Sequence, residues 1–510
     1  MARENDVVTL MRNLHPIAET YVQDTKPDAK LGTVPNRDEY FLGQLSFANG
    51  ISEVSYLGDS GIRSRVMNGM TGILSAKPSG VDFARTLLMD PGHFDREHYS
   101  FTPVRSEMLG EVRCLVIDVE PQPHSGNGRF LGRIWVEDED YHIVRINGTY
   151  VGARMGTHFE SWRLNVLPHV WLPAYSYSEE PDEHSKLGPS IRYKALTRIW
   201  GYDLQHAGDL REYAQPLAET APAATEGKKN DGYDLSGRLS VRPFQYSTED
   251  NIIERLQVAG LMAPTGPVDQ ILETVTENLI ITNKLDLKPE IRCRVLLTAP
   301  LESFSFGHVI VLSRGLIDVL PDEATLAAVL AHELAHIELG HSSEDKYASW
   351  NSLFFPNEKT LQKFDFRLDE AQEEAANKRA AELLAKSPYK DKLAEATLFF
   401  KTLQARAPEL PNLIHPHLGN AVIEADAVKQ SHLAEPAPEL EMARVDQISA
   451  LPLGSRVKID PWSDRIEMLK VRADPVRLAS EKIPFEITPV FPYLRRVQDA
   501  PAMTPPAGSP

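Results

Sequence analysis

One stretch constrains the possible folds of this chain more than any other: LAAVLAHELAHIELGH, residues 326–341. It contains the pattern HExxH, in which His332 and His336 are four positions apart. Residues with this spacing lie on one face of an α-helix, so both imidazoles are able to reach a single ion. Glu333 lies beside them, where a carboxylate is placed to hold and deprotonate a water molecule. The stretch therefore predicts a helix that carries part of a metal site.

The residues around the pattern indicate that this helix is buried. Asp322 supplies a helix start and Gly340 a stop. Apolar residues repeat at helical spacing between them, namely Leu326, Val329, Leu330, Leu334 and Ile337. The alternative is a surface helix with two incidental histidines. Burial argues against that alternative, because buried imidazoles and a buried carboxylate need partners.

A second helix, expected within residues 366–389, offers a third ligand. Zinc hydrolase sites of this kind use three protein ligands and leave one position for water. We predict that Glu373 is this ligand, because the alanines that follow it mark a face able to pack closely on another helix. Glu370 and Glu374 are weaker alternatives, since that packing directs them elsewhere. The competing interpretation is a solvated helix covered with charges.

Together, the two helices resemble those of the gluzincin metallopeptidases that include the CAAX prenyl proteases, HtpX and BepA. In that family the third ligand begins an ExxAD motif, which Glu373 and Ala376 match here. The segment SFGHVIVLSRGLI, residues 305–317, is similar to the family's edge strand. The resemblance implies that His332, His336 and Glu373 bind one zinc ion per chain.

Several positions depart from the family pattern. Asn377 replaces an aspartate that orients a histidine ligand; asparagine still accepts an imidazole N–H but brings no charge. His308 replaces a glycine and is a substrate-side group, an extra inhibitory ligand or an ordinary strand histidine. His415, His417 and Arg465 are candidates for the donor that stabilises the oxyanion of an attacked carbonyl, with loop or surface roles as the alternative.

The length of 510 residues exceeds what one core supports, so several domains are expected. The predicted fold class is α+β, with a mostly antiparallel, half-barrel-like β domain followed by a mainly helical, zincin-type peptidase domain with a small edge sheet. A helical pattern is present at residues 5–23, and residues 24–40 are expected to form a loop or extended connection. The predicted segments are an N-terminal helix and extended segment (1–40), the β-rich accessory domain (41–205), a linker (206–250), the peptidase domain (251–495) and a disordered tail (496–510).

The β-rich region contains short runs of branched and aromatic residues such as RFLGRIWVE, which indicate strands. It resembles the half-barrel sheet of LolA-like lipoprotein carriers and RseB-like periplasmic domains. That resemblance implies an exported protein whose sheet cups an apolar ligand or a partner peptide; the alternative is a folding or interaction module. The acidic run at residues 137–140 is expected to be a solvated turn, with a calcium site as the alternative.

The net charge of -18 argues against nucleic acid and anionic lipid surfaces as partners. No apolar run is long enough to span a membrane. Cys114 and Cys293 are expected to be separate buried thiols. The N-terminus does not read as a signal peptide, so the protein is cytoplasmic, or exported with its leader removed. The sequence leaves the oligomeric state open.

The sequence therefore predicts a zinc-dependent metalloendopeptidase that acts on protein or peptide substrates, with Glu333 as general base. The strand expected at 306–312 is predicted to bind substrate by pairing with it. Two alternatives remain. One is a metal-bound but proteolytically inactive chaperone or scaffold, favoured by Asn377 and the altered strand motif. The other is a lipid or lipoprotein carrier, favoured by the β domain.

Overall fold

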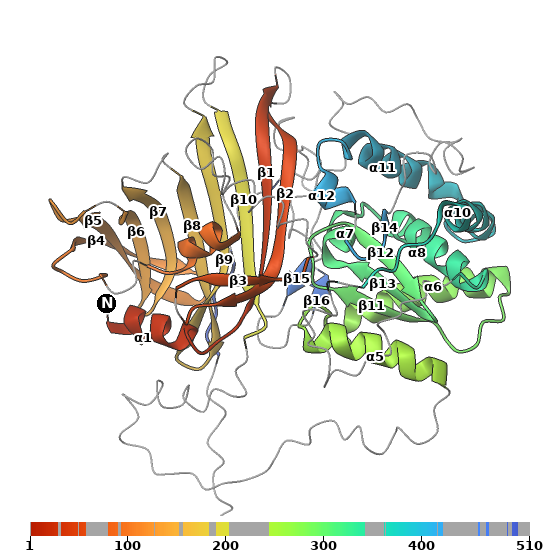
Figure 1. The fold of residues 1–510 in the computed structure, drawn as a ribbon, viewed down its shortest axis with the longest axis horizontal. Coiled ribbons are helices and arrows are strands. Elements are labelled where there is room, and N and C mark those ends of the chain that lie inside the picture. The colour runs from red at the N-terminus through yellow and green to blue at the C-terminus, as the bar shows by residue number, and fades with distance from the viewer. Residues whose placement is uncertain are drawn as a thin grey trace, which may run out of the picture.

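The structure is a computed structural model, and Figure 1 shows its two parts, a large sheet and a helical second domain. The described residues are 2–28, 32–48, 50–57, 80–89, 93–126, 128–151, 157–182, 190–202, 244–341, 362, 364–415, 417–421, 457–459, 466–468, 487 and 492–497.

The first part is a ten-stranded antiparallel sheet in the order β3-β2-β1-β10-β9-β8-β7-β6-β5-β4. Its strands are β1 (Ile17–Asp28), β2 (Gly32–Ser46), β3 (Ser52–Ser55), β4 (Tyr99–Leu109), β5 (Val112–Pro121), β6 (Arg129–Glu137), β7 (Ile143–Val151), β8 (His158–Leu167), β9 (Val170–Asp182) and β10 (Ser190–Trp200). Among the described residues, the short helical segments α1 (Ala2–Met11), α3 (Gly80–Ala84) and η1 (Arg85–Leu87) accompany it. The predicted β-rich, antiparallel region is confirmed.

The predicted helix over residues 5–23 is wrong beyond Met11, where α1 ends. Pro16 has no N–H to donate, and β1 begins at the next residue. The two faces of β1 pack into different core clusters, with Ile17 and Tyr21 on one face and Ala18 and Val22 on the other, so alternation is hidden in the sequence. The predicted connection at residues 24–40 is also largely strand. Residues 17–28 and 32–46 thus belong to the sheet.

The second part begins with α5 (Phe244–Val258), which crosses the predicted boundary at residue 250. Its small sheet has the order β11-β13-β12-β14. The strands are β11 (Arg292–Leu296), β12 (Glu302–Phe306), β13 (Val309–Ser313) and β14 (Asn420–Ala421). The helices are α6 (Pro267–Asn283), α7 (Arg314–Val319), α8 (Glu323–Glu338), α10 (Glu370–Ala385), η4 (Lys390–Lys392), α11 (Leu393–Arg406) and α12 (Pro411–Ile414). A separate pair comprises β15 (Val457–Ile459) and β16 (Ile466–Met468).

The order of the small sheet corrects one functional prediction. β13, which contains most of residues 306–312, is paired with β11 on one side and with β12 on the other. An interior strand has no free edge, so substrate is unable to pair with it as predicted. β12 contacts the helix of the HExxH pattern more extensively than β13 does, and β14 pairs with β12 at Glu302 and Ser303.

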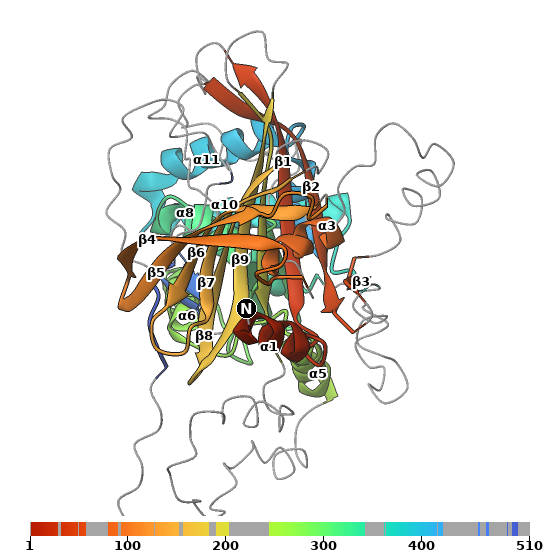
Figure 2. The same cartoon turned by 90° about the vertical axis from the view of Figure 1, so that its left-hand side faces the viewer.

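The large sheet packs directly on the second domain through β1, β2 and β10, as Figure 1 shows. Seen from the side of the sheet in Figure 2, α8, α10 and α11 lie behind the strands. Glu19 of β1 accepts the N–H of Ala299 at 2.5 Å and pairs with Arg314 of α7 at 3.4 Å. Arg198 of β10 donates to the carbonyl of Leu297. Apolar residues of both parts form one continuous core cluster, so the sheet supports the domain that follows it.

The acidic turn between β6 and β7 is an anchor for the end of the chain. Glu137 is fully buried and accepts the N–H groups of Asp140 and His142 within its own turn. The guanidinium of Arg496 lies 2.7 Å from Glu137. The buried Leu494 also packs against the sheet. The prediction of a solvated turn is therefore wrong for Glu137. The alternative prediction placed a calcium ion at this turn, and the structure places the guanidinium of Arg496 there.

The start of the predicted disordered tail, at residue 496, is thus held on the sheet, and residues 498–510 lie outside the described part of the chain. Cys114 and Cys293 are buried, separate free thiols, as predicted. No helix in the described part of the chain is long and apolar enough to cross a membrane.

The contact between β2 and α12 is testable through Asp38. Its carboxylate accepts the N–H groups of Asn412 at 3.0 Å and Leu413 at 2.7 Å, together with the hydroxyl of Tyr21. We expect Asp38→Ala to lower the free energy of unfolding by about 1–3 kcal/mol, because it leaves buried donors without a partner. Urea denaturation would measure this change. Arg37→Ala, at an exposed neighbour, should have almost no effect; equal losses in both variants would contradict the assignment.

Candidate metal centre

Helix α8 forms where the apolar repeat predicted it, and it presents His332 and His336 on one face. Asp322 is its N-cap, and the carboxylate accepts the N–H of Thr325 at 2.7 Å. The helix ends just before Gly340, whose φ of +71° is a backbone conformation that favours glycine. His336 and Glu333 are buried, whereas His332 is partly exposed. The helix thus holds two imidazoles at the boundary of the core.

Helix α10 supplies the carboxylate. It starts with a capping box in which Asp369 and Gln372 satisfy each other's backbone N–H groups. Glu373 follows in the first turn and is buried, as are Ala376 and Ala380 on the same side of the helix. Glu370 and Glu374 are exposed. The face that packs on α8 is therefore the one predicted from the alanine spacing, and Glu373 is the acidic residue of this turn that it presents.

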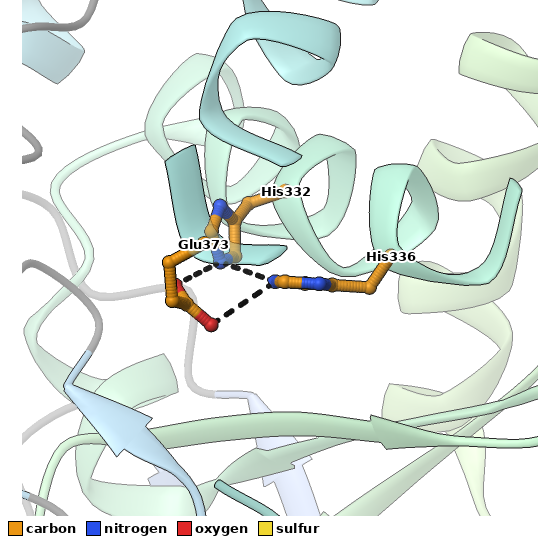
Figure 3. A group of neighbouring side chains, drawn as sticks. All are labelled: His332, His336 and Glu373. Atoms are coloured by element: carbon orange, nitrogen blue, oxygen red, sulfur yellow. Dashed lines mark hydrogen bonds and ion pairs between the residues drawn. The ribbon is translucent and has the colours of Figure 1, made fainter. Parts of the chain in front are cut away.

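The three side chains converge, as Figure 3 shows. The Nε2 atoms of His332 and His336 are 3.0 Å apart. Each lies 3.3 Å from a different oxygen of Glu373. In a tetrahedral zinc site with ligands at about 2.0–2.2 Å, neighbouring ligand atoms are separated by roughly 3.3–3.6 Å. The two nitrogen–oxygen separations lie in this range and the nitrogen–nitrogen separation is slightly shorter, so the three groups are placed to hold one zinc ion.

The electrostatics of the cluster favour a cation. Burial tends to raise the pKa of Glu373, but the hydrogen bonds and charges of His332 and His336 bring it far below its usual range. Burial tends to lower the pKa of His332, but the carboxylates of Glu373 and Glu333 raise it above its usual value. Both shifts have the same cause, which is the attraction between the carboxylates and the protonated imidazoles. When the imidazoles are neutral, the carboxylates of Glu333 and Glu373 leave the cluster with a net negative charge.

Each histidine has a second partner that holds its ring. Asn377, one turn after Glu373 on α10, lies beside His332 and is among the groups that raise the pKa of its imidazole. The Nδ1 atom of His336 lies 3.0 Å from Nδ1 of His341, just beyond the end of α8. The role considered for Asn377 is consistent with this contact, whereas His341 was missed. Its signal in the sequence is a histidine placed directly after the glycine that stops the helix.

Glu333 also has a partner that the sequence did not reveal. The hydroxyl of Ser303 on β12 donates a hydrogen bond of 2.7 Å to Oε1 of Glu333. Both residues are buried. The sequence gives no sign of this contact, because one sequence does not show which helix a strand residue faces.

The remaining candidates do not join the cluster. His308 lies in the turn between β12 and β13, where its backbone N–H and its ring both face Glu249 of α5. His415 is exposed at the end of α12. His417 stacks on Tyr40 of β2, with ring centroids 5.1 Å apart. Arg465 lies outside the described residues. Within the described part of the chain, the group able to hold a metal ion consists of His332, His336 and Glu373.

Comparison with known proteins identifies the class of this site. Residues 269–432 match the model of peptidase family M48, so this part of the chain is of the metallopeptidase kind. The matched range contains both metal-site helices. The resemblance to gluzincin peptidases is thereby confirmed for the second domain. No curated protein matches the sequence.

Two solved structures show similarity at 11% sequence identity. One is a DUF1329 family protein from Desulfovibrio piger, and the other is a LolA superfamily protein from Nitrosomonas europaea. In each case the match covers 39% of this chain and 91% of the other, with a TM-score of 0.20. The second is of the kind that the β-rich region resembles in sequence. At this TM-score, neither match carries an argument about function.

The ligand assignment is testable by metal content. We expect Glu373→Ala to lose zinc during dialysis, because two imidazoles remain where three ligands are required. The matched control is Glu374→Ala, the adjacent exposed carboxylate on the same helix, which should retain zinc. Elemental analysis would give the zinc-to-protein ratio. Full zinc occupancy in Glu373→Ala would remove Glu373 from the ligand set.

The role of His341 is testable by metal affinity. Removing the partner of a histidine ligand typically weakens metal binding by about 10- to 100-fold. We expect this loss in His341→Ala, measured by competition with a chelator of known affinity, and a smaller loss in His341→Gln. His124→Ala, at an exposed histidine of the sheet, serves as the control. Unchanged affinity in His341→Ala would show that His336 needs no such partner.

Proposed function

We propose that this protein is a zinc-dependent metalloendopeptidase. The observation that carries the proposal is the convergence of His332, His336 and Glu373 beside Glu333, inside a segment that matches peptidase family M48. Convergence of three donors from two helices, with separations that fit zinc, supports a built metal site. Two imidazoles and a carboxylate are the ligand set that leaves one position for water in zinc hydrolases.

His332, His336 and Glu373 would hold the ion. When bound, zinc lowers the pKa of a water molecule and polarises a carbonyl oxygen. Asn377 and His341 orient the two imidazoles, so that each Nε2 faces the common site. The packing of α8 on α10 fixes the distance between the histidines and the carboxylate.

Glu333 is the proposed general base. It is the next residue after His332, and its carboxylate is buried near the imidazole of His332. In this role it accepts a proton from the attacking water and then donates that proton to the amine nitrogen of the leaving peptide. The Ser303 hydroxyl occupies Oε1, so Oε2 is the oxygen available for this proton. The products are a carboxylate and a free amine, which together account for the water consumed.

The departures that favoured an inactive scaffold have a physical account. Asn377 keeps the contact with His332 that an aspartate would make. His308 faces Glu249 and leaves the metal cluster unobstructed. A metal-bound, inactive protein is the competing outcome of the experiment below.

The activity is testable with Glu333→Gln. The amide keeps the size of the side chain but is unable to accept the proton, so zinc content should be unchanged and kcat should fall by about 10²–10⁴-fold. Cleavage of denatured casein, with zinc measured on the same sample, would show both effects. Glu370→Gln, at an exposed carboxylate, is the control. A zinc-loaded wild-type protein with no turnover would favour the scaffold, and full activity in Glu333→Gln would remove the assigned base.

A further inference from the structure

The hydrogen bond between Ser303 and Glu333 joins a strand to a helix, and different parts of the fold hold these two elements in place. Glu333 belongs to α8, and Ser303 is the second residue of β12. The backbone of Ser303 is paired with Leu312 of β13 on one side and with Asn420 of β14 on the other. The position of the hydroxyl is therefore set by the small sheet and is independent of α8.

Burial makes the loss of this hydrogen bond costly in free energy. Ser303 and Glu333 are each about 4% exposed. A buried hydroxyl and a buried carboxylate oxygen both lose free energy when they have no hydrogen-bond partner. A hydrogen bond to a charged acceptor is stronger than one between neutral groups. The bond of 2.7 Å between them thus satisfies both groups and restrains a side chain that is otherwise free to rotate.

We propose that Ser303 is a positioning residue for the general base. It fixes the plane of the Glu333 carboxylate by holding Oε1, which directs Oε2 toward the side of the metal cluster. The inference rests on the proposed peptidase function, because a base needs a fixed direction only if it transfers a proton. Ser303 itself touches neither the proposed ligands nor the reacting atoms.

The test uses a pair of variants with the same shape. Ser303→Thr keeps the hydroxyl, whereas Ser303→Val replaces it with a methyl group, and both residues suit a strand. We expect Ser303→Val to have a kcat about 10- to 100-fold below that of Ser303→Thr, with similar KM and zinc content. Ser305→Ala, two residues further along β12, is the control for altering the strand. Equal kcat values for the pair, or a difference confined to KM, would overturn the proposal.

A second measurement does not depend on turnover. In metal-free protein, Ser303→Val should unfold about 2–4 °C below Ser303→Thr, because the buried carboxylate loses its donor. The difference should vanish or change sign when both variants also carry Glu333→Ala. A difference that persists there would show that the hydroxyl serves another group and would overturn the inference.

The two measurements separate the possible failures. If wild-type protein binds zinc but cleaves no peptide while the thermal coupling is present, the peptidase proposal fails, and the positioning role fails with it, although the contact is real. If wild-type protein cleaves peptides and the valine and threonine variants are equal in kcat, the peptidase proposal stands and the role of Ser303 is refuted.

Discussion

The packing of α8 on α10 is the contact on which the rest of the site depends. The two helices pack on each other, and both carry small buried side chains, including Ala331, Ala335, Ala376 and Ala380. Small residues allow the helix axes to approach closely, and this approach brings a carboxylate on one helix within 3.3 Å of imidazoles on the other. Larger side chains at these positions would separate the three donors, whatever their chemistry. The metal cluster is therefore a property of the helix pair.

The helix pair is in turn supported by the large sheet. Glu19 and Arg198, from β1 and β10, reach the loop after β11 and the helix α7, and Asp38 of β2 holds the start of α12. Charged groups buried this deeply are stable only when they are paired and hydrogen-bonded. The sheet and the peptidase domain share one core cluster, so the β domain forms part of the support of the catalytic domain. An accessory module attached only through a linker would lack such contacts.

The predictable features are those written locally in the sequence. The spacing of His332 and His336 reports one turn of helix, and the alanines around Glu373 report a packed face. The features that the sequence did not predict depend on residues far apart in the chain. Glu19 lies in the sheet and Arg314 in the second domain, far apart in the sequence. The residues next to each of them give no indication of its partner. β1 was mistaken for a helix because, as an interior strand, it is buried on both faces and shows no alternation. Glu137 was assigned to solvent because its cation, Arg496, comes from the opposite end of the chain.

The residues behind the proposed ligands also determine the charge of the site. The imidazole partners are an amide from Asn377 and another imidazole from His341, and neither brings a fixed negative charge. A carboxylate in either place would make its histidine a more basic ligand and would neutralise more of the charge of a divalent cation. With neutral partners, Glu373 is the one anionic ligand, so a bound zinc ion would keep a net positive charge. Such a site would bind zinc less tightly and would draw more electron density from water and from a carbonyl oxygen. The proposed base Glu333 would then need a fixed direction more than a high basicity, and the hydroxyl of Ser303 on the neighbouring strand is placed to supply that direction.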